Sequence, residues 1–233
     1  MGEGHSFLWV HIIPGLSTLP DHVACSIIVL FIIFCISINY WLKTRKIESR
    51  LSPSPRMNLC EIMDSVITTI NNLFEQVMGS SSKKYLPLVG SLFIYILLSN
   101  LIGLIPGLIP PTSNISTNFA ISIIVFLLYN VYGFKENGSS YLRHFVGPVL
   151  ALSWLIFPIE ILSHLVRPVS LSVRLMGNMF GDHMVLSIFS NLMPVGIPII
   201  FLALGAFVSL IQALVFTLLS TIYIALSTTH EHV

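Results

Sequence analysis

The chain has 233 residues, of which 55% are hydrophobic and only 9% charged, and its formal net charge is +1. Soluble domains carry roughly 25% charged residues, so this composition, with a mean hydropathy of +0.88, indicates an integral membrane protein with little soluble mass. No basic patch of the kind that binds nucleic acid is present, and we expect no nucleic-acid partner.

The N-terminal part of the chain predicts an arm followed by a membrane span. Residues 1–20 contain glycine, proline and histidine and predict a short, irregular outer arm. Residues 22–42 carry no charge and are long enough to cross a bilayer. Basic residues follow directly, at Lys43, Arg45, Lys46 and Arg50. Because Lys and Arg favour the cytoplasmic ends of spans, the N-terminus is expected outside.

The next segments predict a surface helix and two more spans. Residues 57–78 place apolar side chains on one side of a helix and polar ones on the other, which indicates an amphipathic helix on the inner membrane surface. Residues 86–105 predict a second span, running outward, and a loop rich in Pro, Ser and Thr follows. Residues 118–134 predict a third span, short and running inward.

The last third of the chain consists of two long apolar stretches, residues 141–190 and 195–227. The first is too long for a perpendicular crossing at about 1.5 Å per residue, so the helices are expected to be tilted, bent or parallel to the membrane. The C-terminus is then expected in the cytoplasm. Residues 1–233 are interpreted as a single membrane domain, all-α, with about five membrane helices and one amphipathic surface helix.

Polar residues inside the first long stretch are unusual for a chain of this composition. On a helical wheel, five of them fall within about 40° of Glu160: His164, Arg167, Arg174, Asn178 and Asp182. His183 points nearly opposite to Arg174. A charge at bilayer depth costs several kcal/mol, so this polar stripe is a functional hypothesis by default.

The stripe has two interpretations at this point. It holds as many cations as acids, so it could be an ion-pair network that only joins helices. Ser170, Gly177 and Asn178 flank Arg174, however, and small residues let another helix approach closely. These small residues favour the second interpretation, in which the stripe is a contact surface for another helix. The chain lacks a phosphate-binding glycine loop, a Ser–His–Asp arrangement and zinc-ligand spacing, so no ATP-binding, catalytic, cofactor or metal site is expected.

The run RPVSLSVRLMGNM at residues 167–179 resembles the signature of subunit a of the F-type ATP synthases, roughly P-x-S-L-x-x-R-L-x-G-N. Residues 211–216 resemble the family segment I-Q-A-x-x-F, and residues 99–106 its S-N-L-x-G-x-x-P turn. The resemblance implies that the last two helices are long, tilted and packed as a hairpin against a rotating ring of c subunits, with a subunit b stalk as a further partner.

The resemblance also implies the function. Protons enter and leave through two offset half-channels, and each carboxylate of the c-ring exchanges its proton beside Arg174, so that proton flow is coupled to ATP synthesis or hydrolysis. Glu160 matches a family acid of the cytoplasmic half-channel. Ser170 and Asn178 match polar positions beside the arginine, and Gln212 matches a glutamine that packs close to it.

The outer half-channel is where the sequence departs from the family pattern. His183 stands where many bacterial members carry Glu and mitochondrial members carry His. Mitochondrial members have a partner acid seven residues before the glutamine, where this chain has Gly205. Asp182 is the nearest residue that could share the duty. Whether Asp182 or His183 carries the outer relay stays open.

Two other function classes were weighed against the stator subunit. A secondary transporter with broken helices and a site at the membrane midplane would explain buried charges and prolines, but no internal repeat is visible. A non-transport scaffold would explain the stripe alone. Protons are the expected ion, sodium being less favoured. The compact length and the outer arm favour a bacterial inner membrane.

Overall fold

The computed structural model describes residues 19–44, 59–79, 82–105, 107–138, 141, 153–192 and 196–228. Within these ranges the chain forms six α-helices, one short 3₁₀ turn and no strand, which confirms the all-α prediction. The helices are α1 (Asp21–Thr44), α2 (Leu59–Met78), α3 (Ser82–Ile102), α4 (Ile115–Asn137), α6 (Ser153–Leu192) and α7 (Ile197–Thr228), with the 3₁₀ turn η4 at Pro111–Ser113.

Five of these helices, all except α2, are long and apolar enough to cross a membrane. This confirms the prediction of a multi-pass membrane protein. The exception, α2, is the predicted amphipathic helix: Ile70 and Phe74 are buried on one side, whereas Glu61 and Asn72 are exposed. Its location on the inner membrane surface stays a prediction.

The second span begins and ends earlier than predicted. The sequence suggested 86–105, but α3 runs over Ser82–Ile102 because its exposed first turn tolerates lysine, a good helix former. The helix ends where the chain folds back on itself at Gly103. A Cβ at that position would lie only 2.7 Å from the Pro110 side chain, so this turn needs glycine.

The third span is longer than the predicted 118–134. Asn114 caps the start of α4, since its side-chain oxygen accepts a hydrogen bond of 2.9 Å from the Ser116 backbone. Gly138 ends the helix with φ at +53°, a conformation that favours glycine. With Asn114 and Gly138 as its caps, α4 extends over Ile115–Asn137, about one turn beyond the predicted span at each end.

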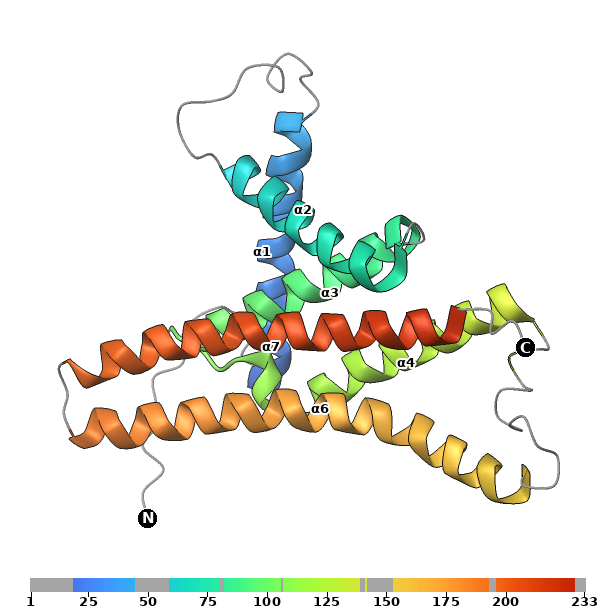
Figure 1. The fold of residues 1–233 in the computed structure, drawn as a ribbon. Coiled ribbons are helices and arrows are strands. Elements are labelled where there is room, and N and C mark those ends of the chain that lie inside the picture. Colours follow the sequence, from blue (N-terminus) through green and yellow to red (C-terminus); the bar gives the residue numbers. More distant parts are fainter. Residues whose placement is uncertain are drawn as a thin grey trace.

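The long helices α6 and α7 lie side by side as an antiparallel hairpin (Figure 1), as expected. The described part of the predicted 141–190 helix begins at Ser153, and residues 142–152 lie outside the described residues. Inside α6, Pro158 and Pro168 each remove a backbone donor. The curvature of α6 in Figure 1 accords with two such interruptions.

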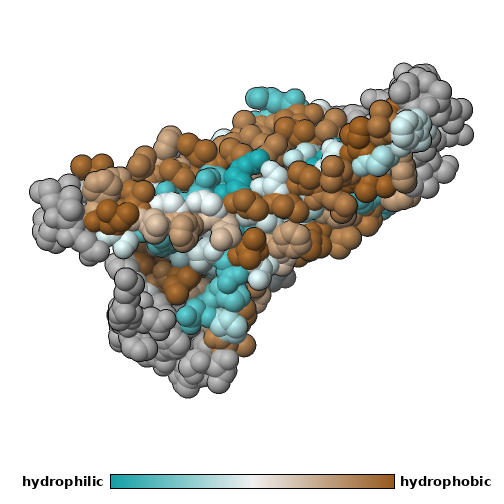
Figure 2. Space-filling view, turned by 90° about the horizontal axis from the view of Figure 1, so that it is seen from below, coloured by the Kyte–Doolittle hydropathy of each residue, from teal (hydrophilic) through white to brown (hydrophobic). Residues whose placement is uncertain are grey.

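The protein core lies where α2, α3, α4, α6 and α7 meet. Its fully buried side chains include Ile96, Tyr129, Leu171, Leu175 and Phe216. Outside this core most large apolar residues are exposed, and the face seen in Figure 2 is mostly hydrophobic, with hydrophilic residues in narrow patches. An apolar exterior is what a bilayer stabilises.

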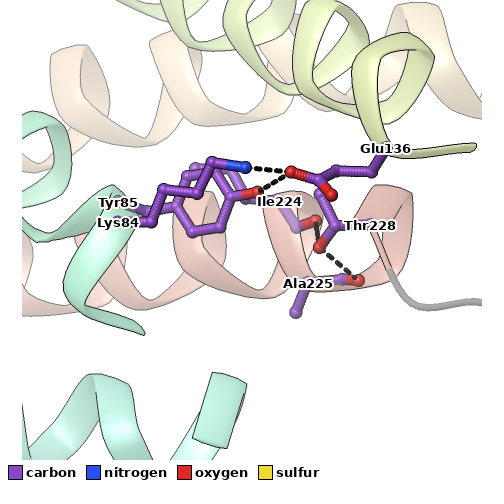
Figure 3. A network of polar contacts seen from close by, with 6 residues as sticks. All are labelled: Lys84, Tyr85, Glu136, Ile224, Ala225 and Thr228. Atoms are coloured by element: carbon purple, nitrogen blue, oxygen red, sulfur yellow. Dashed lines mark hydrogen bonds and ion pairs between the residues drawn. The ribbon is translucent and has the colours of Figure 1, made fainter. Parts of the chain in front are cut away.

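At one end of the bundle, polar contacts join α3, α4 and α7. Lys84 pairs with the Glu136 carboxylate, and the Tyr85 hydroxyl donates to the same oxygen at 3.4 Å (Figure 3). The Asn137 side chain donates to the Ser227 carbonyl at 2.8 Å. Lys84 and Glu136 are partly exposed, so water screens their attraction. The network fixes how the helix ends are placed more than it stabilises the fold.

Candidate functional site

The polar stripe on α6 faces α4 and α7 over most of its length. His164 is buried, and Leu171, which shares the stripe's face, belongs to the core at 2% exposure. Glu160 and Arg167 are half-buried. The stripe is therefore an interior face of the bundle at His164 and Leu171, and it comes to the molecular surface around Arg174 and Asn178.

Arg174 lies on the border between this interior face and an open surface. Its side chain is half-buried, and its Nη1 is sealed from solvent without a hydrogen-bond partner among the described residues. Ser170 and Gly177, one turn to either side, are exposed, and a Cβ at Gly177 would meet nothing within 4 Å. An uncompensated buried cation is costly, so this arrangement favours an anionic partner outside the chain.

Gln212 of α7 lies inside the bundle at 3% exposure and bonds to α6. The Asn178 amide donates to the Gln212 side-chain oxygen, one turn beyond Arg174. The Gln212 nitrogen is buried and has no partner in the described part of the chain. Gln212 thus faces α6 near the arginine and not lipid. A direct contact between Gln212 and Arg174 stays a prediction.

Asp182 and His183 share one pocket although they point about 100° apart on the wheel. The pocket has a volume of about 90 Å³ and lies between α6, α7 and the turn after α3. Its lining residues are Gly103, Leu104, Met179, Asp182, His183, Val185, Leu186, Phe201, Leu204 and Gly205. One water needs about 10–15 Å³ of such space, so several waters fit between the two titratable groups.

Gly205 is part of this pocket and explains its shape. A Cβ on Gly205 would lie 2.9 Å from Cδ2 of Leu104, so Leu104 occupies the space that a side chain would need. The Asp182 Oδ2 atom is buried without a partner within the described ranges. Buried polar atoms are normally hydrogen-bonded, to water where no protein group is near. The adjacent pocket is large enough to hold such a water.

A second row of buried polar residues was missed in the sequence. Thr112 donates to Asn100 at 2.7 Å, Asn118 donates to the Thr112 carbonyl at 2.7 Å, and Ser172 donates to Ser122 at 3.0 Å. All five side chains are fully buried. We call Asn100, Thr112, Asn118, Ser122 and Ser172 the buried polar row. It connects η4, α3 and α4 with the α6 turn that precedes Arg174.

Some atoms of this region are left without a hydrogen bond. Ser99 Oγ, Asn100 Nδ2 and Asn118 Oδ1 are buried and unpartnered in the part of the chain that the structure describes. Buried polar atoms are almost always bonded, to water where no protein group is near. The signal in the sequence was the spacing of Asn118 and Ser122, four residues apart within an apolar span.

The opposite end of the stripe forms a separate cluster around Glu160. His164 Nδ1 lies 3.3 Å from the Glu160 carboxylate. The Arg167 guanidinium lies over two aromatic rings, 5.9 Å from the centre of Tyr129 and 5.0 Å from that of Tyr223. Along a straight helix Glu160 is about 21 Å and His183 about 13 Å from Arg174. The predicted site residues therefore form two groups on opposite sides of the arginine.

Comparison with known proteins decides the family. The model of the ATP synthase A chain family matches residues 23–225. The chain belongs to this family. Its relatives include ATP synthase subunit a of Bdellovibrio bacteriovorus, 42% identical over 228 residues, which are 97% of this chain and 100% of that relative.

Two further relatives carry the name ATP synthase subunit a. That of Geobacter sulfurreducens is 45% identical over 201 residues, 86% of each chain. That of Sorangium cellulosum is 38% identical over 226 residues, 97% of this chain and 88% of the relative. The predicted membership of the ATP synthase A chain family is confirmed. As a member, the chain is a multi-pass membrane subunit of an ATP synthase.

Proposed function

We propose that the chain is the proton-translocating stator subunit of an F-type ATP synthase, with Arg174 between two half-channels. The observation that carries the proposal is the position of Arg174: one of its nitrogens is sealed from solvent with no hydrogen-bond partner among the described residues, and it lies beside an open surface of small residues. A carboxylate on each subunit of a rotating c-ring fits this surface as the missing anion.

The chemistry follows from the cost of charge in lipid. A ring carboxylate that faces lipid must be neutral. Beside Arg174 the ionised form is favoured, so the carboxylate releases its proton there. Because arginine keeps its own proton in proteins, Arg174 also stops protons from passing directly between the half-channels. Protons then cross the membrane only when the ring turns.

The outer half-channel consists of the Asp182–His183 pocket and the buried polar row, and the inner one of the cluster at Glu160. The pocket volume and the unpartnered polar atoms support a water-filled outer path. The partial exposure of Glu160 supports an inner opening. Ser170, Asn178 and Gln212 shape the arginine's surroundings. The subunit neither binds ATP nor catalyses a reaction alone.

In this proposal the protein lies in a bacterial inner membrane with the N-terminus outside and the C-terminus in the cytoplasm. Besides the c-ring, a subunit b stalk is its partner, and lipid covers the rest. The transported ion is the proton, since imidazole and carboxylate groups line both paths. The transporter alternative requires broken helices, whereas α6 and α7 are continuous over Ser153–Leu192 and Ile197–Thr228.

The test is Arg174→Ala in membrane vesicles that contain the assembled complex, with ATP-driven acidification as the readout. We expect acidification to be lost while the subunit still inserts, since removal of a costly charge eases insertion. Lys135→Ala is the matched control, because Lys135 is an exposed cation at the end of α4 and its loss changes the net charge equally. Normal acidification with Arg174→Ala would refute the proposal.

A further inference from the structure

His164 is a buried histidine of the Glu160 cluster, and the sequence motif gives it no role. It lies one turn from Glu160 toward Arg174, and only 6% of its surface is exposed. Glu160, whose side chain is 25% exposed, lies nearer to water. An imidazole in an apolar membrane protein is expensive to bury without a purpose, so its surroundings are informative.

The hydrogen bonds of His164 fix its tautomer. Nδ1 lies 3.1 Å from the Glu160 backbone carbonyl and 3.3 Å from the Glu160 carboxylate. The backbone carbonyl is the hydrogen-bond partner and can only accept, so Nδ1 carries the proton, and the carboxylate lies within ion-pair distance of the same N–H. The other nitrogen, Nε2, is then the one that gains or loses a proton. This is the arrangement in which a carboxylate orients an imidazole and stabilises its charged form.

Among the residues that the structure describes, charged and titratable groups near His164 come from three helices and from Tyr141. Arg167 follows on α6, Tyr129 of α4 lies with its ring centre 6.1 Å from that of His164, and Tyr223 of α7 lies 6.1 Å from Tyr129. Tyr141 is hydrogen-bonded to Asn130, one residue after Tyr129. Arg167 is held over the two tyrosine rings. Glu160, 3.3 Å from Nδ1, is a carboxylate in this described neighbourhood that can stabilise an imidazolium.

We propose that the proton-binding group of the inner half-channel is the Glu160–His164 pair, with His164 carrying the proton. This inference rests on the proposed function. The imidazole takes a proton from one water at Nε2 and becomes an imidazolium beside the Glu160 carboxylate. It then gives the proton from Nε2 to another water and becomes neutral again. Nδ1–H stays bonded to Glu160 throughout, so Glu160 is a positioning residue that also stabilises the charge.

The first test is His164→Gln, measured as passive proton flux through the Fo sector in vesicles with equal amounts of assembled complex. Glutamine keeps a side-chain amide donor for Glu160 but cannot titrate. We expect the flux to fall about a hundredfold, the lower end of what a positioned acid–base group contributes. The matched control is His22→Gln, since His22 lies at the start of α1 beside Asn114 and far from this cluster in the chain.

The second test separates proton binding from a structural role through the pH profile. Glu160→Gln removes the charge that stabilises the imidazolium, so the pH midpoint of the flux should move down by about one unit or more. In His164→Gln the same step should disappear from the profile. A merely structural histidine would change the amount of assembled complex and leave the midpoint in place.

The outcomes distinguish the two proposals. If His164→Gln conducts like the unmodified complex over the whole pH range, or Glu160→Gln leaves the midpoint unchanged, His164 does not carry the proton. In either case Arg174→Ala would still abolish acidification, and the proposed function would stand. If the unmodified complex itself does not conduct protons, the proposed function fails and this inference fails with it.

Discussion

The Asn178 side-chain amide donates a hydrogen bond to the side-chain oxygen of Gln212, and this bond joins α6 to α7 one turn beyond Arg174. Gln212 is buried and Asn178 lies at the edge of the open surface. The bond therefore connects the interior of the hairpin with the border on which the arginine lies. Its loss should change the arginine's surroundings without breaking the bundle.

We expect Gln212→Leu to reduce ATP-driven proton pumping strongly and thermal stability only slightly. Hydrogen bonds between membrane helices contribute about 0.6 kcal/mol on average, so the stability of the assembled complex changes little. Pumping falls because Asn178 loses the acceptor that orients it beside Arg174. The measurements are acidification rates and thermal melting for Gln212→Leu, Asn178→Leu and the double variant.

The double variant provides the control for this prediction. If the two residues act through their shared bond, the double variant should pump no worse than the poorer single variant. Multiplied losses would mean that each side chain acts independently, and the bond would then have no role in orienting the site.

The buried polar row gives a second prediction, on the outer path. Asn118→Leu removes the amide that donates to the Thr112 carbonyl at 2.7 Å and replaces a site for water with an apolar side chain. We expect passive proton flux to fall on the order of tenfold, since one lost hydrogen bond costs about 0.5–1.5 kcal/mol and about 1.4 kcal/mol corresponds to a tenfold change in rate. The measurement is flux through the Fo sector in vesicles.

Asn39→Leu is the matched control, since Asn39 is an exposed asparagine on α1 whose amide bonds only locally to the Cys35 carbonyl at 2.8 Å. It should conduct normally. Equal flux in Asn118→Leu and the unmodified complex would remove the buried polar row from the outer path. The pocket at His183 would then be its sole component.

The sequence could predict the features that depend on the local pattern of residues. The five spans follow from hydropathy, and α2 follows from its period. The position of Arg174 on one face with Asn178 follows from helix geometry alone. The family resemblance added roles for these residues, and the family match bears out the resemblance although the individual roles remain proposals.

What the sequence could not predict depends on contacts between distant segments. In the sequence Asn118 was only the first residue of the predicted third span, because its partner Thr112 lies in a separate turn and Asn100 on another helix. The end of α3 depends on Pro110 packing against Gly103. Nor does a helical wheel show that Asp182 and His183 share one pocket, since α7 and the turn after α3 complete it.

The last prediction concerns the division of labour between His183 and Asp182. His183 is expected to be the group that binds and releases protons in the outer half-channel, because an imidazole changes charge near neutral pH. Asp182 is expected to hold water in the shared pocket of about 90 Å³, into which both side chains project. His183→Ala should slow proton flux strongly, His183→Glu should restore much of it, and Asp182→Asn should have a smaller effect.

Gly205 offers a way to test this assignment from the facing helix. A side chain there meets Leu104, whose Cδ2 lies 2.9 Å from the position of a Cβ, so Gly205→Glu needs Leu104→Ala to make room. The combined variant puts a carboxylate opposite His183, and it should restore the flux lost in Asp182→Asn because the pocket regains an acid. Leu104→Ala alone is the control and should not restore the flux lost in Asp182→Asn. Flux and ATP-driven pumping are measured in vesicles with equal amounts of complex. If His183→Ala pumps like the unmodified protein while Asp182→Asn is inactive, the aspartate is the proton-binding group and the roles are reversed.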